Sequence, residues 1–228
     1  MEKVIIFGNG EIADLAYYYF LNDENCSFQV VAFVVDDNFI KESNFKGLPI
    51  VPMSKLQSLY PSNQYKAHIA LSYNKLNQVR EEKFKLFKSL GYSLVSYVSS
   101  KSFYWPDLNV GENCFILENQ TIQPTVKIED NVMIWSTNHL GHNSIIKSHS
   151  YLSSGITVSG HTSIGERTFV GVNSSFKDFI SVGSDCFITM GSIVTKDIPD
   201  GSTVTSKDIF DKNSIVNKKL KKKYFNIN

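Results

Sequence analysis

Apolar side chains recur at every sixth residue through the second half of this chain, and this period constrains the fold more than any other feature. The phase holds without a break over fifteen positions, and glycine or another small residue recurs at fixed offsets between them. The apolar positions are Val110, Ile116, Ile122, Ile128, Ile134, Leu140, Ile146, Leu152, Val158, Ile164, Val170, Phe176, Val182, Ile188 and Val194.

A hexad of this kind fits a short strand that points one large side chain inward and then turns a tight corner, which glycine and small residues permit. Three hexads close a triangular coil. Because a single coil cannot bury its apolar face, coils must stack as parallel strands. Ordinary strands of a β-sandwich would not hold a period of six. The sequence therefore predicts a parallel β-helix over residues 110–199, with about five coils of roughly 18 residues each.

The first half of the chain alternates between strand and helix patterns. Strands are predicted at residues 4–7, 29–35, 68–72 and 93–98, and helices at residues 11–20 and 78–90. Strands that alternate with helices imply a small parallel α/β sheet. We therefore expect two domains, residues 1–105 and residues 106–228.

A glycine loop, Gly8-Asn9-Gly10, joins the first predicted strand to the first helix. Such a turn lets a ligand approach the backbone near a helix N-terminus. Asp36 and Asp37 follow the second strand, where they could recognise a ribose or a base. The dinucleotide fingerprint is incomplete, because Ala13 stands at its third glycine position. A mononucleotide or nucleotide sugar suits this short domain better than NAD, and a purely structural turn is the alternative.

Composition excludes several other classes of protein. Of 228 residues 42% are hydrophobic and the formal net charge is +1, so the chain as a whole has no strong pull toward nucleic acid or membrane. The basic segment 218–223 is expected to be a solvated end. No apolar run approaches the roughly 20 residues of a membrane span. Three scattered cysteines suggest neither disulfides nor a zinc site, and a cytoplasmic location is the expectation.

The order of parts resembles the bacterial sugar-nucleotide N-acetyltransferases, a group that includes the sialic-acid O-acetyltransferases. These proteins have an α/β N-terminal nucleotide-binding domain followed by a left-handed parallel β-helix of hexapeptide repeats. The resemblance covers nearly the whole chain. It is carried by the segments Ile6-Phe7-Gly8-Asn9-Gly10, Phe33-Val34-Val35-Asp36-Asp37-Asn38 and Asn138-His139-Leu140-Gly141-His142-Asn143-Ser144.

The resemblance implies a set of site residues. Family members place a general-base histidine four residues before an aliphatic hexad residue, which here is His142 before Ile146. The sugar nucleotide would contact Gly10, Glu11, Ile12, Asp36, Asp37 and Ser72, with His139 as a further substrate contact. Acetyl-CoA would lie along Tyr151, Val172 and Met190. No metal is implied.

The chain departs from the family pattern in two places. Ser72 stands where a glycine is common. Asn143, which is expected to be catalytic together with His142, stands beside it where an acidic residue is often found. This leaves open the group that raises the basicity of His142. Of the other histidines, His161 is expected about one coil beyond His142, at the border of the site. His68 is expected to be structural, and His149 to be a solvent-facing polar residue of a coil.

The function implied is direct acetyl transfer from acetyl-CoA to the amine of a nucleotide-linked 4-amino-4,6-dideoxy sugar, with His142 as the base. O-acetylation of a sugar such as sialic acid and a non-catalytic sugar-nucleotide-binding scaffold are the alternatives. The resemblance also implies a homotrimer with the acyl site between neighbours. The outward residues Trp135, Phe169 and Phe187 are expected to be exposed in a monomer.

Overall fold

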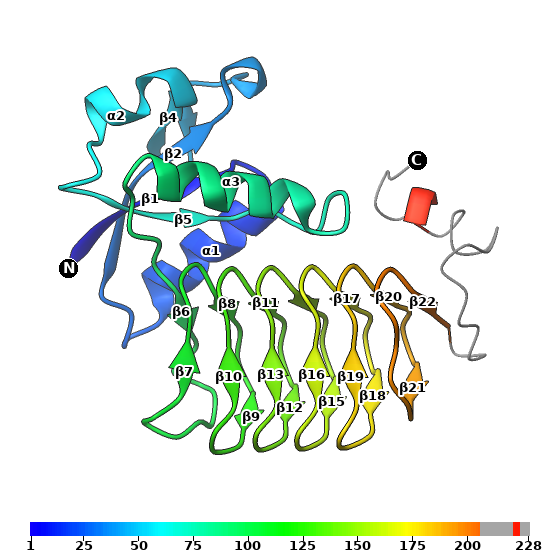
Figure 1. Ribbon diagram of the computed structural model, residues 1–228. Coiled ribbons are helices and arrows are strands. Elements are labelled where there is room, and N and C mark those ends of the chain that lie inside the picture. The colour runs from blue at the N-terminus through cyan, green and yellow to red at the C-terminus, as the bar shows by residue number, and fades with distance from the viewer. Residues whose placement is uncertain (206–220, 224–228) are drawn as a thin grey trace.

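The computed structural model describes residues 1–205 and 221–223, which form an α/β domain docked along a triangular β-helix (Figure 1). Of the basic segment predicted to be a solvated end, residues 218–220 lie outside the described residues. Lys222 and Lys223 are exposed, and Lys221 is half-buried. In the part of the chain that is described, no helix combines the length and the apolar character needed to cross a membrane.

The first domain is built on a five-stranded sheet with the order β3-β4-β2-β1-β5, parallel except for the β3–β4 pair. Apolar side chains alternate between its two faces: Ile6 and Phe33 pack toward α1, and Ile5 and Val34 pack toward α3. The elements are β1 (Glu2–Phe7), α1 (Glu11–Asn22), β2 (Phe28–Val35), a 3₁₀ turn (Asp37–Phe39), β3 (Asn44–Phe45), β4 (Leu48–Pro52), a second 3₁₀ turn (Met53–Lys55), α2 (Leu56–Leu59), β5 (Lys66–Ile69) and α3 (Gln78–Ser89).

The strand predicted at residues 93–98 is divided between the two parts of the molecule. Leu94 bridges to Ala67 beside β5, whereas β6 (Tyr97–Val98) pairs with β8 of the β-helix. Phe103 also pairs with the β-helix, at Thr121. β-helix pairing therefore begins before residue 106, and the division into residues 1–105 and 106–228 remains a prediction.

The β-helix has three sheets, and partner strands over residues 97–194 are 18 residues apart in sequence, as the hexad predicted. The chain winds around them with a left hand (Figure 1). Face 1 holds β7 (Asn109–Val110), β10 (Lys127–Ile128), β13 (Ile145–Ile146), β16 (Ser163–Ile164) and β19 (Ser181–Val182). Face 2 holds β6, β8 (Phe115–Ile116), β11 (Met133–Ile134), β14 (Tyr151–Leu152), β17 (Phe169–Val170), β20 (Phe187–Ile188) and β22 (Thr203–Val204). Face 3 holds β9 (Thr121–Ile122), β12 (His139–Leu140), β15 (Thr157–Val158), β18 (Ser175–Phe176) and β21 (Ile193–Val194). The last coil is shorter, because β20 pairs with β22 at a separation of 16 residues.

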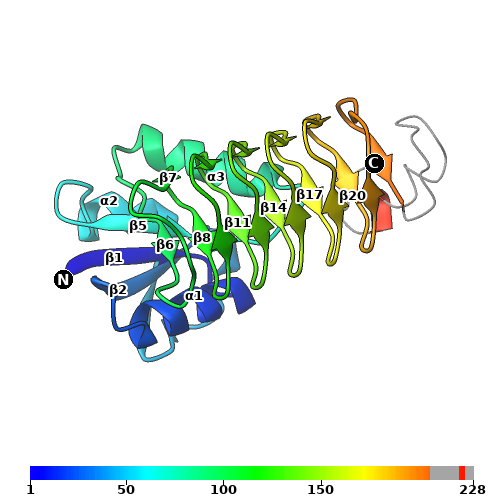
Figure 2. The same ribbon diagram turned by 90° about the horizontal axis from the view of Figure 1, so that it is seen from below.

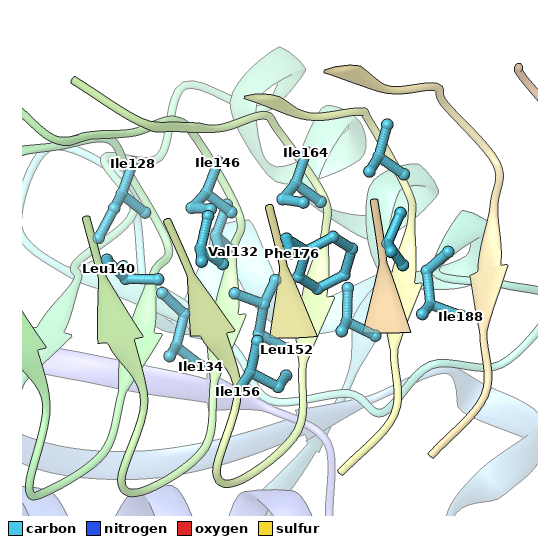
Figure 3. Close-up of a cluster of buried hydrophobic side chains, with 14 of the residues drawn as sticks. Ile128, Val132, Ile134, Leu140, Ile146, Leu152, Ile156, Ile164, Phe176 and Ile188 are labelled. Carbon is cyan, nitrogen blue, oxygen red and sulfur yellow. The ribbon is translucent and has the colours of Figure 1, made fainter. Parts of the chain in front are cut away.

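The second residue of each strand points into the prism, and together these side chains fill it (Figure 3). From Ile116 to Val194 every sixth residue is at most 3% exposed. The residue two positions before each hexad residue, from Cys114 to Ser192, is also buried. It is apolar at positions such as Val132 and Ile156. Where it is serine or threonine its hydroxyl bonds locally; Ser144 Oγ, for example, donates to the carbonyl of Gly141 at 2.6 Å. The interior is therefore apolar, with its few hydroxyls bonded to corner carbonyls.

The corners turn in a way that the sequence pattern did not predict. Left-handed backbone conformations also recur every six residues, but mostly at Asn, Thr, His or Asp, as at Asn143 with φ 58°. The glycines that directly follow the hexad residue serve a different need: a Cβ on Gly141 would lie 2.5 Å from the backbone N of Gly160 in the next coil. These glycines permit coils to stack closely, and polar residues make the turn.

The first domain covers face 2, whose strands lie in one row in Figure 2. The outward residues of face 2 pack against α1 and the segment before α3. The expectation that Trp135, Phe169 and Phe187 are exposed in a single chain is therefore wrong. Phe187 is buried against Leu76, and Trp135 and Phe169 are half-buried.

A buried arginine fixes α3 to the corner between faces 1 and 2. Arg80 is 2% exposed and donates to the backbone carbonyls of Asn131, His149 and Ser150 and to Asn77 Oδ1. Burial lowers the pKa of Arg80 to about 10. Since its partners are uncharged oxygens, the arginine serves as a hydrogen-bond hub between the two parts.

Candidate functional site

His142 lies in the corner that joins β12 to β13, where faces 3 and 1 meet. Its backbone N–H donates to Gln123 Oε1 at 2.9 Å. The imidazole lies over Gly160 of the next coil, where a Cβ would stand 2.9 Å from Nε2 and 3.0 Å from Cε1. Gly160 therefore provides the space in which this ring lies.

Asn143 connects His142 to the residues stacked above and below it. Its Nδ2 lies 3.0 Å from His142 Nδ1 and 3.3 Å from His161 Nε2, and its Oδ1 accepts from Thr125 Oγ1 at 2.7 Å. Thr125, Asn143 and His161 occupy the same left-handed corner position in three successive coils. The period of 18 thus brings together polar groups that are distant in sequence.

His161 lies beside His142, where the sequence placed it. The two rings make an edge-to-face contact at 5.1 Å, and the other side of His161 stacks on Phe179 at 4.6 Å with an interplanar angle of 10°. Phe179 itself is 71% exposed. His139 lies on face 3, between Thr121 and Thr157 of the neighbouring strands, and its substrate role remains a prediction.

A cavity of about 410 Å³ opens at the carboxyl ends of β1, β2 and β5 in the first domain. Five of the six residues expected to contact the sugar nucleotide line this cavity: Gly10, Glu11, Ile12, Asp36 and Ser72. The loop before α1 requires glycine, because Gly8 has φ +122° and a Cβ there would lie 2.7 Å from the Ala70 carbonyl. The cavity is large enough for part of a nucleotide.

The sixth residue, Asp37, is not among the cavity-lining residues. Its Oδ1 accepts from the backbone N–H of Ser54 at 3.0 Å, and hydrogen bonds from Ser54 lower the pKa of Asp37. Asp36 instead forms an ion pair with Lys83 of α3, at 2.5 Å. Sequence reasoning missed Lys83, which lines the cavity and lies over the Phe7 ring at 5.1 Å.

The three residues expected to line the acetyl-CoA groove do not lie together. Val172 and Met190 follow β17 and β20 in equivalent corner positions and are 39% and 71% exposed. Tyr151 is 4% exposed on face 2, with its ring against Tyr73 and its hydroxyl bonded to Trp135 Nε1. Burial raises the pKa of Tyr151 to about 12. As placed, Tyr151 faces the first domain, so its cofactor role stays a prediction that the single chain does not support.

The expectation that His149 faces solvent is wrong. His149 is 7% exposed, its Nδ1 lies 2.8 Å from Asn131 Nδ2, and its ring packs on Phe84. Burial lowers its pKa to about 4, against the opposing effect of the nearby Glu81 carboxylate. His68 is buried as expected, with Nδ1 3.0 Å from the Val95 carbonyl. Neither histidine belongs to the corner of His142.

The cavity and His142 lie on different sides of the same β-helix. The first domain contacts the face 1–2 corner through Arg80, face 2, and the face 2–3 corner through Tyr19 and Glu118. The loops that join face 3 to face 1 form the lower edge in Figure 1, away from α3. One chain therefore does not bring its own cavity to its own His142.

The described part of the chain contains no group of three His, Cys, Asp or Glu side chains able to hold a metal ion. The three cysteines are also poor nucleophiles. Burial raises the pKa of Cys114 to about 12, that of Cys186 to about 11, and that of Cys26 above its ordinary value. A thiolate is the reactive form of cysteine, so the described thiols are not activated.

Sequence comparison finds a hexapeptide repeat in part of the second half of the chain. A family model described as the hexapeptide repeat of succinyl-transferase matches residues 161–196. An acyl-[acyl-carrier-protein]–UDP-N-acetylglucosamine O-acyltransferase of Helicobacter pylori (strain Shi470) is 27% identical over 113 residues, 46% of this chain and 42% of that protein. A putative acetyltransferase, YvoF, of Bacillus subtilis (strain 168) is 25% identical over 83 residues, 36% of this chain and 48% of that protein. The chain spans less than half the length of these relatives.

Solved structures match both domains. Perosamine N-acetyltransferase from Caulobacter crescentus, solved as a histidine-to-asparagine mutant with CoA and GDP-perosamine, has a TM-score of 0.81 at 22% identity, covering 92% of this chain and 97% of that one. The acetyltransferase domain of PglB from Neisseria gonorrhoeae FA1090, solved with acetyl coenzyme A, has a TM-score of 0.79 at 20% identity, covering 92% and 98%. This likeness establishes the fold, an α/β domain followed by a left-handed β-helix.

Proposed function

We propose that this chain transfers an acetyl group from acetyl-CoA to a nucleotide-linked amino sugar. It carries hexapeptide acyltransferase repeats within the fold of sugar-nucleotide N-acetyltransferases. The acceptor would be a 4-amino-4,6-dideoxy sugar. One combination of features carries the proposal: a cavity in the first domain that is large enough for part of a nucleotide and, at a β-helix corner, a histidine whose ring lies over a glycine.

In the proposed reaction the sugar amine attacks the thioester carbonyl of acetyl-CoA directly. A C–N bond forms, the amine loses a proton to His142 Nε2, and the tetrahedral intermediate collapses with cleavage of the C–S bond. The CoA thiolate then takes this proton from the His142 imidazolium, which restores the neutral base. An imidazole suits this role near neutral pH. Direct transfer is supported by the unactivated cysteines, which give no candidate for a covalent acyl-enzyme.

The first domain would hold the nucleotide part of the acceptor. Helix α1 has Gly10 as its N-cap and no side-chain cap, so its first N–H groups face the cavity mouth without a competing side-chain acceptor. A helix N-terminus of this kind favours a diphosphate. Lys83 adds a positive charge, and Asp36 adds an acceptor for a ribose or base. Asp37 is expected to make no contact with the nucleotide and to stabilise the neighbouring loop through its hydrogen bond from Ser54.

The complete site would be shared between copies of the chain. Because the cavity and His142 lie on different sides of one β-helix, a second copy must bring its cavity to the His142 corner. We infer a homotrimer, since packing three prisms around a common axis places the His142 corner of each chain beside a neighbouring chain. The exposed side chains of Val172 and Met190 would then border the acetyl-CoA groove. A cytoplasmic location is part of this proposal.

The proposal is tested by CoA release with a panel of UDP-, dTDP- and GDP-linked 4-amino-4,6-dideoxy sugars, with mass spectrometry of the product. We expect a mass gain of one acetyl group on one acceptor of the panel and no gain on its 4-hydroxy analogue. Acetylation of hydroxyl acceptors alone, including free sialic acid, would replace N-transfer by O-transfer. Tight nucleotide-sugar binding without any CoA release would indicate a non-catalytic scaffold.

A further inference from the structure

We propose that the side-chain amide of Asn143 sets which nitrogen of His142 carries the proton, and that His161 is a positioning residue that acts through this amide. The proposal rests on the function proposed above, in which His142 Nε2 must present a lone pair. It concerns a position where the chain has an amide in place of the more usual carboxylate.

The geometry brings one amide to two imidazoles and one hydroxyl. Asn143 Nδ2 faces His142 Nδ1 at 3.0 Å and His161 Nε2 at 3.3 Å, while Oδ1 faces Thr125 Oγ1 at 2.7 Å. Each contact is within hydrogen-bonding distance. The protonation of both rings is therefore coupled to the orientation of this amide.

Two hydrogen-bond patterns fit these positions, because an amide turned by half a rotation has nearly the same shape. With Nδ2 toward the rings, the amide donates to His142 Nδ1, and the neutral ring keeps its proton on Nε2. Such a ring has no lone pair for the substrate amine. With Oδ1 toward the rings, His142 donates from Nδ1–H, and Nε2 becomes the base.

Thr125 favours the second pattern. Its hydroxyl has one hydrogen but faces two acceptors, the Pro124 carbonyl at 2.5 Å and Asn143 Oδ1 at 2.7 Å. When the amide is turned, Nδ2 donates to Thr125 Oγ1 and the hydroxyl hydrogen goes to the carbonyl of Pro124. Both contacts are then satisfied, so this pattern gains one hydrogen bond.

His161 also favours the orientation in which Oδ1 of Asn143 faces the rings. In the turned amide, Oδ1 accepts from His161 Nε2–H as well as from His142 Nδ1–H. The stack on Phe179 holds the His161 ring in place for this contact. When His142 becomes an imidazolium, both of its nitrogens carry protons, and only Oδ1 offers Nδ1–H an acceptor. The amide thus supports the base before and after proton transfer.

A direct test is the tautomer of His142, read by ¹⁵N NMR on the full chain labelled at histidine, with His142→Asn for assignment. The wild type should show neutral His142 with an unprotonated Nε2. Asn143→Gly should shift it toward the Nε2–H form, and Asn143→Asp should not. Glycine and aspartate already occupy the equivalent left-handed corner position, at Gly155, Gly191 and Asp185, so both variants are expected to fold. A wild type that already has the Nε2–H form would overturn the proposal.

A kinetic cycle separates positioning from packing. Asn143→Gly should lower kcat by roughly 10–100-fold, the range seen when an orienting partner is lost, with KM for both substrates nearly unchanged. His161→Phe, which keeps the stack on Phe179, should lower kcat by roughly 3–10-fold in the wild type. In the Asn143→Asp background, His161→Phe should leave kcat almost unchanged. Both oxygens of a carboxylate accept from His142 Nδ1–H, so no neighbour is needed to orient the group. An equal cost in both backgrounds contradicts the proposal. Absence of turnover with every acceptor would refute the function but leave the NMR result standing.

Discussion

At the scale of single residues, the proposed chemistry depends most on His142. His142 is exposed, and its ring contacts Gly160, Asn143 and His161, so its removal should leave the fold intact. We expect His142→Ala and His142→Asn to retain wild-type melting and both ligand affinities. Turnover should fall by roughly 10²–10⁴, the usual worth of a general base. An alanine variant that keeps more than about a third of wild-type turnover would exclude this role.

Gly160 offers a separate test of the ring position. A methyl group there would stand 2.9 Å from His142 Nε2, so the ring must move. We expect Gly160→Ala to lower kcat by up to roughly 10²-fold, as misplaced catalytic groups do, with unfolding free energy changed by about 1 kcal/mol or less. Gly141→Ala is the matched control, because its Cβ would meet backbone at 2.5 Å. It should instead lower stability in urea titrations.

The two neighbouring aspartates should differ in their effects. Asp36 lines the cavity beside Lys83, whereas Asp37 accepts from Ser54 outside it. Calorimetry should show that Asp36→Asn weakens nucleotide-sugar binding by roughly 10-fold or more, as for a lost charged hydrogen bond. Acetyl-CoA binding should be unaffected. Asp37→Asn should change acceptor affinity by less than about 3-fold. The reverse order would move the nucleotide site away from this cavity.

At the scale of elements, the hexad pattern was enough to predict the strands, the inward side chains and the coil of 18 residues. It could not predict what covers each outward side chain. Trp135 and His149 look like exposed positions in the repeat, but they lie under the first domain. The same limit applies to Asp37 and Lys83, since strand and helix patterns do not tell which side chain turns toward a cavity. Periodicity determines whether a side chain points into or out of the β-helix. Which outward side chains are covered depends on tertiary contacts with the first domain.

Two histidines buried between the first domain and the β-helix predict sensitivity to acid. His68 and His149 have pKa values of about 4 because burial opposes their charge, against about 6.5 in an unfolded chain. Between these values the unfolded chain binds protons that the folded chain does not, so stability is complete above pH 6.5 and falls as the pH drops toward 4. Between pH 6.5 and pH 4, each histidine lowers the free energy of unfolding by up to about 3 kcal/mol.

Urea titrations at pH 7, 6 and 5 measure this loss as a falling midpoint. His149→Gln retains a polar side chain without a titrating group. It should reduce by about half the fall of the urea midpoint between pH 7 and pH 5. His139→Gln is the matched control, because His139 lies half-exposed on face 3. A midpoint that stays constant from pH 7 to pH 5 in the wild type would show that the two buried histidines do not govern stability.

At the scale of the whole molecule, the sequence predicts two domains joined along one chain, but not that the proposed nucleotide cavity and the proposed base lie on different sides. That separation arises from the docking of the first domain on face 2 and two corners. A single chain would then be inactive however well each half is formed. The assembly, rather than the protomer, would be the functional unit.

Subunit complementation tests this arrangement. In a trimer with shared sites, His142→Ala chains retain intact cavities and Asp36→Ala chains retain intact histidines. Activity is measured at an acceptor concentration well below KM. There the His142→Ala parent should be nearly inactive, and the Asp36→Ala parent should keep about a tenth or less of the wild-type rate. Mixing the two in equal amounts through a denatured state should restore about a quarter of wild-type activity, since each site draws its two parts from different copies at random. Sedimentation should give three chains per particle for the parents and the mixture. If each site lay within one chain, mixing would restore nothing, and a monomer at micromolar concentration would remove the basis for sharing.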